Sequence, residues 1–233
     1  MKVAIMQPYF LPYIGYFQLI NAVDKFIIYD NIEFTKKGWI NRNRILVNGK
    51  DEFMSLPITK ASDFLHVNQR YLASNFVKEK IKILRKIKEC YRKAPNFQMI
   101  FTLTEEIFNY ENNNLFEFIF NSIKKICGYL GISTELITSS SLDINHNLKS
   151  EDKVISICNY LNATKYINSI GGQNLYVKEN FFDAEIELIF IKSQPITYQQ
   201  FDFEFLPWLS ILDVLMFNSK EEVKKMLNQN ELT

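Results

Sequence analysis

The sequence predicts an α/β fold with a parallel sheet and one helical insertion, and three observations support this prediction. Short apolar runs alternate with helical patterns in residues 1–44 and again in residues 134–191, as expected for βαβ units. Residues 73–130 show only helical patterns, and so does the tail. We therefore expect a single α/β domain over residues 1–233, with an insertion at about 73–130 and a helical tail at about 208–231.

Residues 1–44 contain the opening βαβ unit. An apolar run at 3–6 is followed by a Pro-punctuated turn at 7–12. Apolar residues then recur every three or four positions to Val23, and a second apolar run at 25–29 ends at Asp30. Ligands of such folds bind beyond the carboxyl ends of the strands. We therefore place the functional site at this edge.

The start of the first helix resembles a known phosphate-binding turn. Residues 13–16, Tyr-Ile-Gly-Tyr, stand where Rossmann-like enzymes of the nucleotidyltransferase (HUP) type carry His-x-Gly-His. In those enzymes the glycine lets a phosphate approach, and the histidines stabilise developing charge. Gly15 is kept, but both His positions are Tyr, and a neutral phenol supplies no cation. We expect nucleotide or diphosphate binding without adenylyl transfer; the alternative is that Tyr13 and Tyr16 are packing aromatics.

The segment 36–44 is rich in basic and polar side chains. Arg42 can bind a diphosphate or carboxylate bidentately, with Lys37 adding charge. The alternative is a solvated loop anchored by Trp39. A hairpin follows at 44–57, because its turn is Asn48-Gly49, the strongest short hairpin signal.

The insertion is predicted to hold three helices. The first begins at about residue 73, has an apolar face from Phe76 to Tyr91 and ends before the break at 94–96; the others span 97–110 and 115–130, the last ended by Gly131. Lysines and arginines form a stripe on the first helix. Glu79 and Glu89 interrupt it and aromatic residues are absent from that face, so it predicts a solvated helix face rather than a nucleic-acid site.

The α/β pattern resumes after Gly131. We predict strands at 134–138, 165–168 and 186–191, and a helix at 150–161 with Ser150 as its N-cap. Gly171 and Gly172 follow a strand, where glycines permit close backbone approach to a ligand. A helix at 210–217 carries Asp213 on an apolar background. A buried carboxylate needs a partner, for which a lysine or arginine of 36–44 is the candidate.

Composition excludes several classes of protein. The formal net charge of +1 favours neither nucleic acid nor a membrane surface as partner. The three cysteines are far apart and include no Cys-x-x-Cys pair, which favours free buried thiols in a reducing compartment. We see neither a signal peptide nor an apolar run long enough to span a bilayer. The expectation is a soluble cytoplasmic protein without membrane insertion.

Four blocks of sequence resemble the WbqC-like protein family: MQPYFLPYIGYFQLI, KKGWINRNRI, INSIGGQNLY and FLPWLSILDVLMFNS. They cover essentially the whole chain, in the family's order. The matching motif residues are Gln7, Pro8, Tyr9, Pro12, Gly15, Tyr16, Asp30, Lys37, Gly38, Trp39, Asn41, Arg42, Asn43, Gly171, Gly172, Gln199, Trp208, Ser210 and Asp213. None is Cys or His, so the motifs offer neither a thiol nucleophile with a His base nor a His-rich metal site.

The resemblance implies work on a bacterial surface glycan of the O-antigen type, because members of this family are usually encoded among such genes. The first hypothesis is transfer of an acyl or aminoacyl group, such as glycyl, from a thioester of coenzyme A or a carrier protein to the amine of a nucleotide-linked sugar. Asp30 or Asp213 would be the base, and Tyr16 or Asn41 would donate to the oxyanion. The binding residues would be Gln7, Pro8, Tyr9, Gly15, Lys37, Gly38, Trp39, Arg42, Asn43, Gly171, Gly172 and Gln199.

Two alternatives stay open. The first is HUP-type chemistry, which is nucleotidyl transfer or acyl-adenylate formation with ATP or CTP and Mg²⁺; the tyrosines at both His positions count against it. The second is a protein without catalysis that binds a nucleotide sugar and assembles pathway partners. Turnover by the purified protein would exclude the second alternative.

Overall fold

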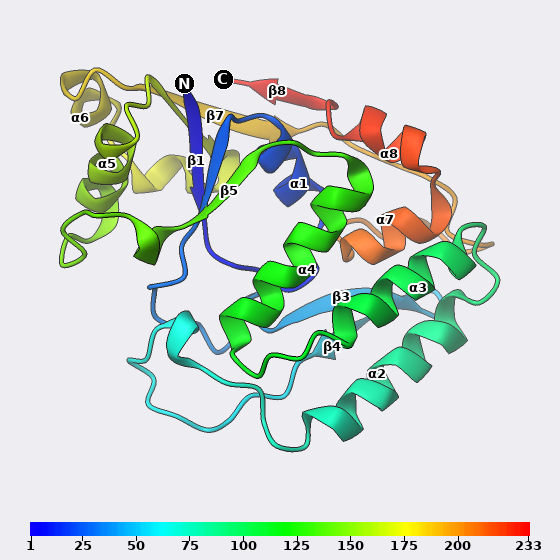
Figure 1. Ribbon diagram of the computed structural model, residues 1–233. Helices are drawn as coiled ribbons and strands as arrows, with labels where there is room; N and C mark the ends of the chain where they lie inside the picture. Colours follow the sequence, from blue (N-terminus) through cyan, green and yellow to red (C-terminus); the bar gives the residue numbers. More distant parts are fainter.

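The computed structural model describes residues 1–233 and contains a six-stranded sheet with helices on both faces (Figure 1). The strand order is β5-β2-β1-β6-β7-β8, and every neighbouring pair is parallel except β7 and β8. The strands are β1 (Lys2–Met6), β2 (Lys25–Ile28), β5 (Glu135–Thr138), β6 (Lys165–Ser169), β7 (Glu187–Ser193) and β8 (Asn230–Leu232). The predicted α/β class with a mostly parallel sheet is confirmed.

The strand order reverses at the middle of the sheet. The chain moves outward from β1 through β2 to β5, and then returns to place β6 and β7 on the other side of β1. The carboxyl ends of β1 and β6 therefore flank a topological switch point, which is where open α/β sheets bind ligands. β1 ends at Met6 and β6 ends at Ser169, so the Pro-rich turn and the two glycines meet there.

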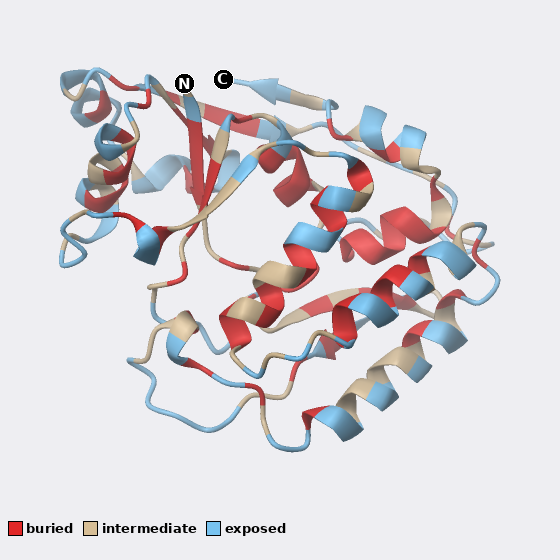
Figure 2. Ribbon diagram, viewed as in Figure 1, coloured by how far each residue is buried: buried red, intermediate tan, exposed pale blue.

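Alternate residues of the strands feed two hydrophobic clusters. Val3 and Ile5 of β1 face a cluster that also contains residues of α5 (Ser150–Tyr160) and α6 (Lys178–Asp183). Ala4 faces a larger cluster, which contains α1 (Ile14–Asn21), the insertion helices and α7 (Ile211–Phe217). In Figure 2, α7 is buried along almost its whole length.

The insertion contains three helices at the predicted places: α2 (Phe76–Tyr91), α3 (Phe97–Phe108) and α4 (Leu115–Leu130). Asn114 caps α4 by accepting a hydrogen bond from the Glu117 N–H. Gly131 ends α4 in the left-handed conformation, with φ of 71°. The hairpin forms as predicted between β3 (Arg42–Val47) and β4 (Lys50–Ser55), with Gly49 at φ of 79°. The hairpin packs between the insertion and α7 (Figure 1).

The chain ends in a short helix, which was predicted, and a short strand, which was not. Ser219 and Glu222 form a capping box at the start of α8 (Lys220–Met226). Strand β8 was not predicted, because Asn230, Glu231 and Leu232 show no apolar alternation and pair only with the edge of β7. The three 3₁₀ turns are η1 (Val67–Gln69), η2 (Ser139–Ser141) and η3 (Ile170–Leu175).

The three cysteines form no disulfide. Cys127 and Cys158 are free and buried, and Cys90 is half-buried, as the apolar surroundings predict. Burial raises the pKa of the Cys127 and Cys158 thiols to about 12, so both are held as unreactive thiols. None of the helices combines the length and the apolar character needed to cross a bilayer.

Candidate functional site

Three clefts lie along the carboxyl edge of the sheet. The switch-point cleft has a volume of about 400 Å³ and lies over the ends of β1 and β6. The aromatic cleft, of about 260 Å³, adjoins it through Tyr9, which lines both. The Asp30 cleft, of about 430 Å³, lies over the ends of β2 and β5. It adjoins the switch-point cleft along the chain, since Tyr29 lines one and Asp30 the other.

The switch-point cleft collects four of the predicted binding residues, namely Gln7, Tyr9, Gly171 and Gly172. Its polar lining also includes residues that the sequence did not single out: Ser150, Glu151, Asn168, Ser169, Tyr29 and Tyr176. Strand ends supply one side and the start of α5 supplies the other. The topology therefore joins two glycines and a glutamine that are far apart in the chain.

Asn168 is the main polar group that sequence reasoning missed in this cleft. It is only 5% exposed, and its Oδ1 accepts a hydrogen bond from the Ser169 N–H at 2.8 Å. Its NH₂ group therefore points the other way and meets no protein acceptor. The side-chain amide of Gln7 likewise makes no hydrogen bond within the protein, although its backbone oxygen accepts from Tyr16. Two amides are thus free for a ligand.

The two glycines differ in what they permit. A Cβ on Gly172 would lie 2.6 Å from Asn168 Nδ2, so glycine is needed there for the amide to keep its place. A Cβ on Gly171 would meet nothing within 4 Å. Gly171 therefore lines the cleft at a position where a small side chain would not disturb the fold.

The start of α5 forms the opposite wall. Ser150 has a left-handed φ of 48° and makes no capping bond, so its predicted role as N-cap is wrong. Glu151 accepts hydrogen bonds from the Val177 N–H at 2.6 Å and from Asn180 Nδ2. This carboxylate therefore ties the segment after η3 to α5.

The tyrosines at the start of α1 are both packed. The Tyr16 hydroxyl donates to the Gln7 carbonyl at 2.9 Å, and burial raises the pKa of this phenol well above its usual value. The Tyr13 ring lies over Gly15, where a Cβ would be 2.3 Å from Tyr13 Cε2. The Tyr13 ring thus covers Gly15 at the start of the helix.

Asp30 is buried at the end of β2, and its carboxylate accepts four hydrogen bonds. Oδ1 accepts from Ser139 Oγ and the Ser140 N–H, each at 2.9 Å. Oδ2 accepts from Asn68 Nδ2 at 2.8 Å and Ser140 Oγ at 2.5 Å. These four donors match the capacity of an ionised carboxylate. Of the four, the Ser140 hydroxyl is exposed and lines the Asp30 cleft with the carboxylate.

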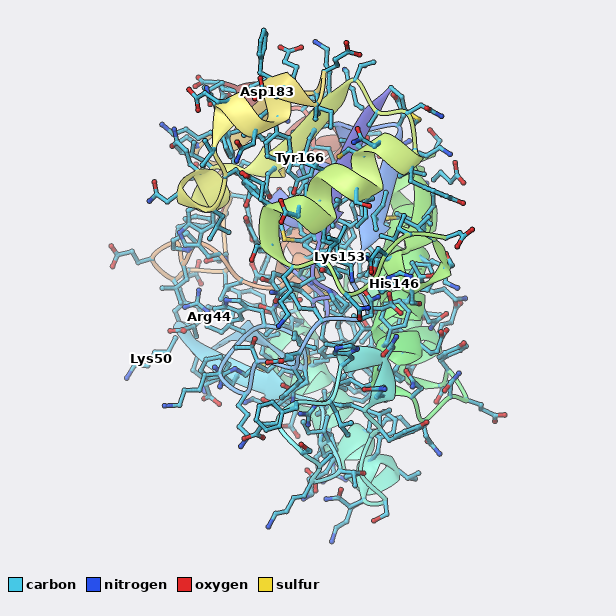
Figure 3. All side chains as sticks on the ribbon, turned by 90° about the vertical axis from the view of Figure 1, so that its left-hand side faces the viewer. Arg44, Lys50, His146, Lys153, Tyr166 and Asp183 are labelled. Carbon is cyan, nitrogen blue, oxygen red and sulfur yellow. The ribbon has the colours of Figure 1, made fainter.

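Lys153 lies on the inner side of α5 and is only 2% exposed. Its ammonium donates to the His146 carbonyl at 3.3 Å, a neighbour visible in Figure 3, and lies 5.0 Å from the centre of the Tyr29 ring. Burial lowers the pKa of Lys153, and the charge of Asp30 raises it. The sequence carried a signal for it, because Lys153 shares the inner face of α5 with Ile157, at helical spacing.

The aromatic cleft contains Trp39 and Asn43, two further predicted residues, with Tyr9, Tyr13, Trp208, Pro12 and Arg44. Asn43 is buried and fixes the cleft's base, since its Nδ2 donates to the carbonyls of Phe10 and Leu11 at 3.2 and 2.8 Å. The hairpin and the Pro-rich turn are joined by these bonds.

The arginine that lines this cleft is Arg44, not Arg42. Arg42 donates to the backbone carbonyls of Gly38 and Lys37, at 3.0 and 2.5 Å, and stacks on Phe53. It thereby shapes its own loop. Arg42 and Lys37 line none of the three clefts, so their predicted contact with a diphosphate stays a prediction without a structural contact behind it.

Five other predicted residues line none of the three clefts: Pro8, Gly15, Gly38, Asn41 and Gln199. The Asn41 amide donates to the Leu56 carbonyl at 2.8 Å, and Pro8 is buried between Gln7 and Tyr9. Gln199 is exposed and donates to the Phe201 carbonyl at 3.2 Å. Its neighbour Gln200 is the buried one.

Asp213 is completely buried and lines none of the clefts. Its carboxylate accepts hydrogen bonds from the Tyr91 hydroxyl at 2.8 Å, the Tyr198 hydroxyl at 2.6 Å and Gln200 Nε2 at 2.7 Å. The prediction of a lysine or arginine partner from segment 36–44 is wrong, because two phenols and an amide satisfy the carboxylate instead. The group ties α7 to α2 and to the segment after β7.

The Asp213 network predicts a pH dependence of stability. Burial raises the pKa of Asp213 above its ordinary value of 3.8, while hydrogen bonds from Tyr198, Tyr91 and Gln200 lower it. A raised pKa means that the folded state binds more protons than the unfolded state, so stability is lost as pH rises through the folded pKa. The unfolding free energy of the wild type, minus that of Asp213→Asn, should therefore fall as pH rises from below 3.8 and then level off. Urea denaturation of both proteins across pH measures this; a difference that grows with pH would contradict it.

No three His, Cys, Asp or Glu side chains lie close enough together to hold a metal ion.

The chain was compared with known proteins. The family model described as the WbqC-like protein family matches residues 7–225. The chain is also similar to "Uncharacterized protein Rv1507c" of Mycobacterium tuberculosis (strain ATCC 25618 / H37Rv), with 31% identity over 229 residues that make up 97% of each chain. No solved structure matches. The matched range includes Gln7, Asp30, Arg44, Asn168 and Trp208, and thus residues of all three clefts.

Proposed function

Because this chain belongs to the WbqC-like protein family, we propose that it modifies a nucleotide-linked amino sugar during synthesis of a bacterial surface glycan. Membership of the family by itself suggests a role in polysaccharide-related biosynthesis. The finer proposal is that the protein transfers an acyl or aminoacyl group, such as glycyl, from a thioester to the sugar amine. The observation that carries the proposal is the switch-point cleft, with two buried or half-buried amides free for a ligand.

The amides of Gln7 and Asn168 bind the ribose and diphosphate part of the nucleotide sugar in this proposal. Gly171 admits the ligand because its backbone carries no side chain into the cleft. Phosphate oxygens accept hydrogen bonds, and neutral amide donors suit them where the lining holds no arginine. Lys153 adds a positive charge behind the ring of Tyr29, which lines this cleft.

Asp30 is the base in the proposed reaction. The amine displaces the Ser140 hydroxyl from Asp30 Oδ2 and then attacks the thioester carbonyl carbon. The new C–N bond forms, the C–S bond breaks, the thiolate leaves with the electron pair, and the amine proton goes to Asp30. The freed Ser140 hydroxyl can then donate to the oxyanion. We prefer Asp30 to Asp213 because Asp30 lines a cleft and Asp213 does not.

Tyr16 and Asn41 are weaker candidates for the oxyanion donor. Each already donates to a backbone carbonyl, Tyr16 to Gln7 and Asn41 to Leu56. Either would have to give up a bond that holds the fold before it could serve the reaction.

One observation favours the HUP-type alternative, namely the strand order with a βαβ opening and a cleft at the switch point. The Tyr13 ring argues against it, since that ring covers Gly15 at the start of the helix. An ATP and Mg²⁺ sample belongs in the test for this reason.

A ligand panel with two glycine variants tests the proposal. An amino sugar nucleotide should raise the melting temperature of the wild type, and with an acyl thioester it should turn over; ATP with Mg²⁺ should do neither. Gly171→Ala should weaken binding by about tenfold, roughly the effect of 1.4 kcal/mol, without changing stability, because Gly171 lines the cleft and an added methyl meets no protein atom.

Gly128→Ala is the matched control for this panel. A Cβ there also meets nothing within 4 Å, but Gly128 lies on α4, away from the three clefts. It should bind as the wild type does. Equal affinity in Gly171→Ala and Gly128→Ala would remove the switch-point cleft as the nucleotide site, and stabilisation by ATP with Mg²⁺ alone would favour nucleotidyl transfer. Tight binding of the amino sugar nucleotide without turnover would favour the assembly role.

A further inference from the structure

We propose that the aromatic cleft is a nucleobase subsite, and that it takes a base that presents a ring carbonyl oxygen to Arg44. This inference rests on the proposed function and deepens it, because it names which end of the nucleotide sugar binds where and what kind of base the protein accepts.

The walls of the cleft are two tryptophans that lie outside the hydrophobic core. The chain has two tryptophans, and both Trp39 and Trp208 line this cleft. They are 39% and 60% exposed. Trp208 also has a left-handed φ of 62°, a conformation that is uncommon for a bulky residue. Exposed aromatic side chains around a cleft are typical of sites that stack a flat ring.

Arg44 connects the two walls. Its guanidinium lies 5.5 Å from the centre of the Trp39 ring, and its Nη2 donates to the Trp208 carbonyl at 3.3 Å. Its Nη1 pairs with Asp51 at 2.9 Å. Figure 3 shows Arg44 on the hairpin, on the side of the molecule that also carries α5.

Two of the five N–H donors of Arg44 are used in these bonds, and three are left over. Its Nε is buried and has no hydrogen-bond partner. A buried N–H without an acceptor is costly, and the second N–H groups of Nη1 and Nη2 also have no acceptor in the protein, so a ligand oxygen has several donors of Arg44 to bind. Arginine recognises bases by donating to acceptors on their edge, so a base with a ring carbonyl fits these donors. Uracil and thymine have such a carbonyl, and adenine has none.

The order of the clefts matches the order of groups in a nucleotide sugar. The aromatic cleft meets the switch-point cleft at Tyr9, and the switch-point cleft meets the Asp30 cleft at Tyr29 and Asp30. A base between the tryptophans leads to phosphates at Gln7 and Asn168 and to a sugar amine at Asp30. If the sugar bound in the aromatic cleft instead, its amine would lie at the opposite end of the three clefts from the catalytic carboxylate of Asp30.

Tryptophan fluorescence tests the inference directly, because both tryptophans report on this cleft. Uridine and thymidine, which carry no phosphate, should change the emission of the wild type in a saturable way. Adenosine should bind at least about tenfold more weakly, the scale of one lost base contact to arginine. Glucose 1-phosphate should leave the emission unchanged.

Two variants and a control identify the groups responsible. Arg44→Lys keeps the charge but loses the planar fork, and should weaken uridine binding by about tenfold. Trp208→Phe keeps an aromatic wall, so it should still bind uridine with Trp39 as reporter. Phe64→Ala removes an aromatic residue that is 80% exposed and lines none of the three clefts, and it should bind uridine as the wild type does.

The outcomes separate this inference from the proposed function. If uridine did not change the tryptophan emission while the protein turned over an amino sugar nucleotide, the base subsite alone would be overturned. A response to glucose 1-phosphate without one to uridine would overturn it too, by making the cleft a sugar site. A uridine response that Arg44→Lys weakens, in a protein without acyl transfer, would support the base subsite and overturn the proposed reaction.

Discussion

Replacement of Asp213 by alanine is expected to lower the free energy of unfolding by about 3–5 kcal/mol, because each buried donor left without an acceptor costs about 1–3 kcal/mol. Three donors converge on this carboxylate, from Tyr91, Tyr198 and Gln200. In the variant both tyrosine hydroxyls lose their acceptor, and Gln200 Nε2 keeps only its bond to the Leu206 carbonyl. Tyr91 would keep only the bond that it accepts from the Leu46 N–H. Urea denaturation and thermal melting measure the loss, which for a chain of this size corresponds to roughly 10 °C.

Asp213→Asn is the control for this prediction. It keeps an oxygen acceptor of the same shape, and the tyrosine hydroxyls can rotate to accept from its NH₂ group. It should therefore be destabilised much less than Asp213→Ala. Tyr198→Phe removes one of the three donors and should lie between the two. If Asp213→Ala unfolded at the same urea concentration as the wild type, the carboxylate would not be holding these elements together.

Asp30→Asn is expected to reduce acyl transfer by about 100-fold or more, because a positioned general base contributes roughly 10²–10⁴ to the rate. The amide has the shape of the carboxylate but takes up no proton. Steady-state kinetics with an amino sugar nucleotide and an acyl thioester measure this effect.

Asn68→Ala provides the matched control. It removes one donor to Asp30 Oδ2, at 2.8 Å, but leaves the carboxylate itself in place. Its rate should fall far less than that of Asp30→Asn, because the carboxylate that takes up the proton is still present. Activity of Asp30→Asn within about threefold of the wild type, well below the effect of a general base, would leave Asp30 a purely structural residue.

Asp30 and Asp213 show why the sequence alone predicts two candidates for the general base but does not distinguish between them. Each follows or lies within an apolar run, and each was a candidate on that ground. The fold gives Asp30 the serines of η2 and a cleft, and gives Asp213 two tyrosines and an amide without a cleft. The partners that make this difference are distant in the chain. Ser140 reaches Asp30 because β5 pairs with β2, and Tyr91 reaches Asp213 because α2 packs near α7.

The arginines of β3 give a second example. Arg42 and Arg44 are two positions apart, and both were part of the predicted basic segment. They share one face of the strand, yet they meet different neighbours: Arg42 stacks on Phe53, while Arg44 lies near the Trp39 ring and donates to the Trp208 carbonyl. Trp208 is far from both in the sequence, so its position beside Arg44 could not be predicted from local pattern.

The sequence by itself determined the helices, strands and turns, and which residues lie at the carboxyl edge of the sheet. Apolar periodicity, the Asn48-Gly49 turn, Gly131 and the capping box at Ser219 specify local structure, because each acts on neighbours within a few residues. It also placed Gln7, Asp30 and Gly171 at one edge of the sheet, because parallel strands end together.

Only the tertiary structure decided which polar groups are free for a ligand. Gln7 and Asn168 keep unpaired amides and Arg44 keeps an unpaired Nε, while Asn41, Tyr16 and Asp213 are used up inside the fold. The physical reason is that hydrogen bonds over long sequence distances form only when the strand order and packing bring donor and acceptor together. A sequence names the polar groups, and the folded chain determines which of them still lack a partner.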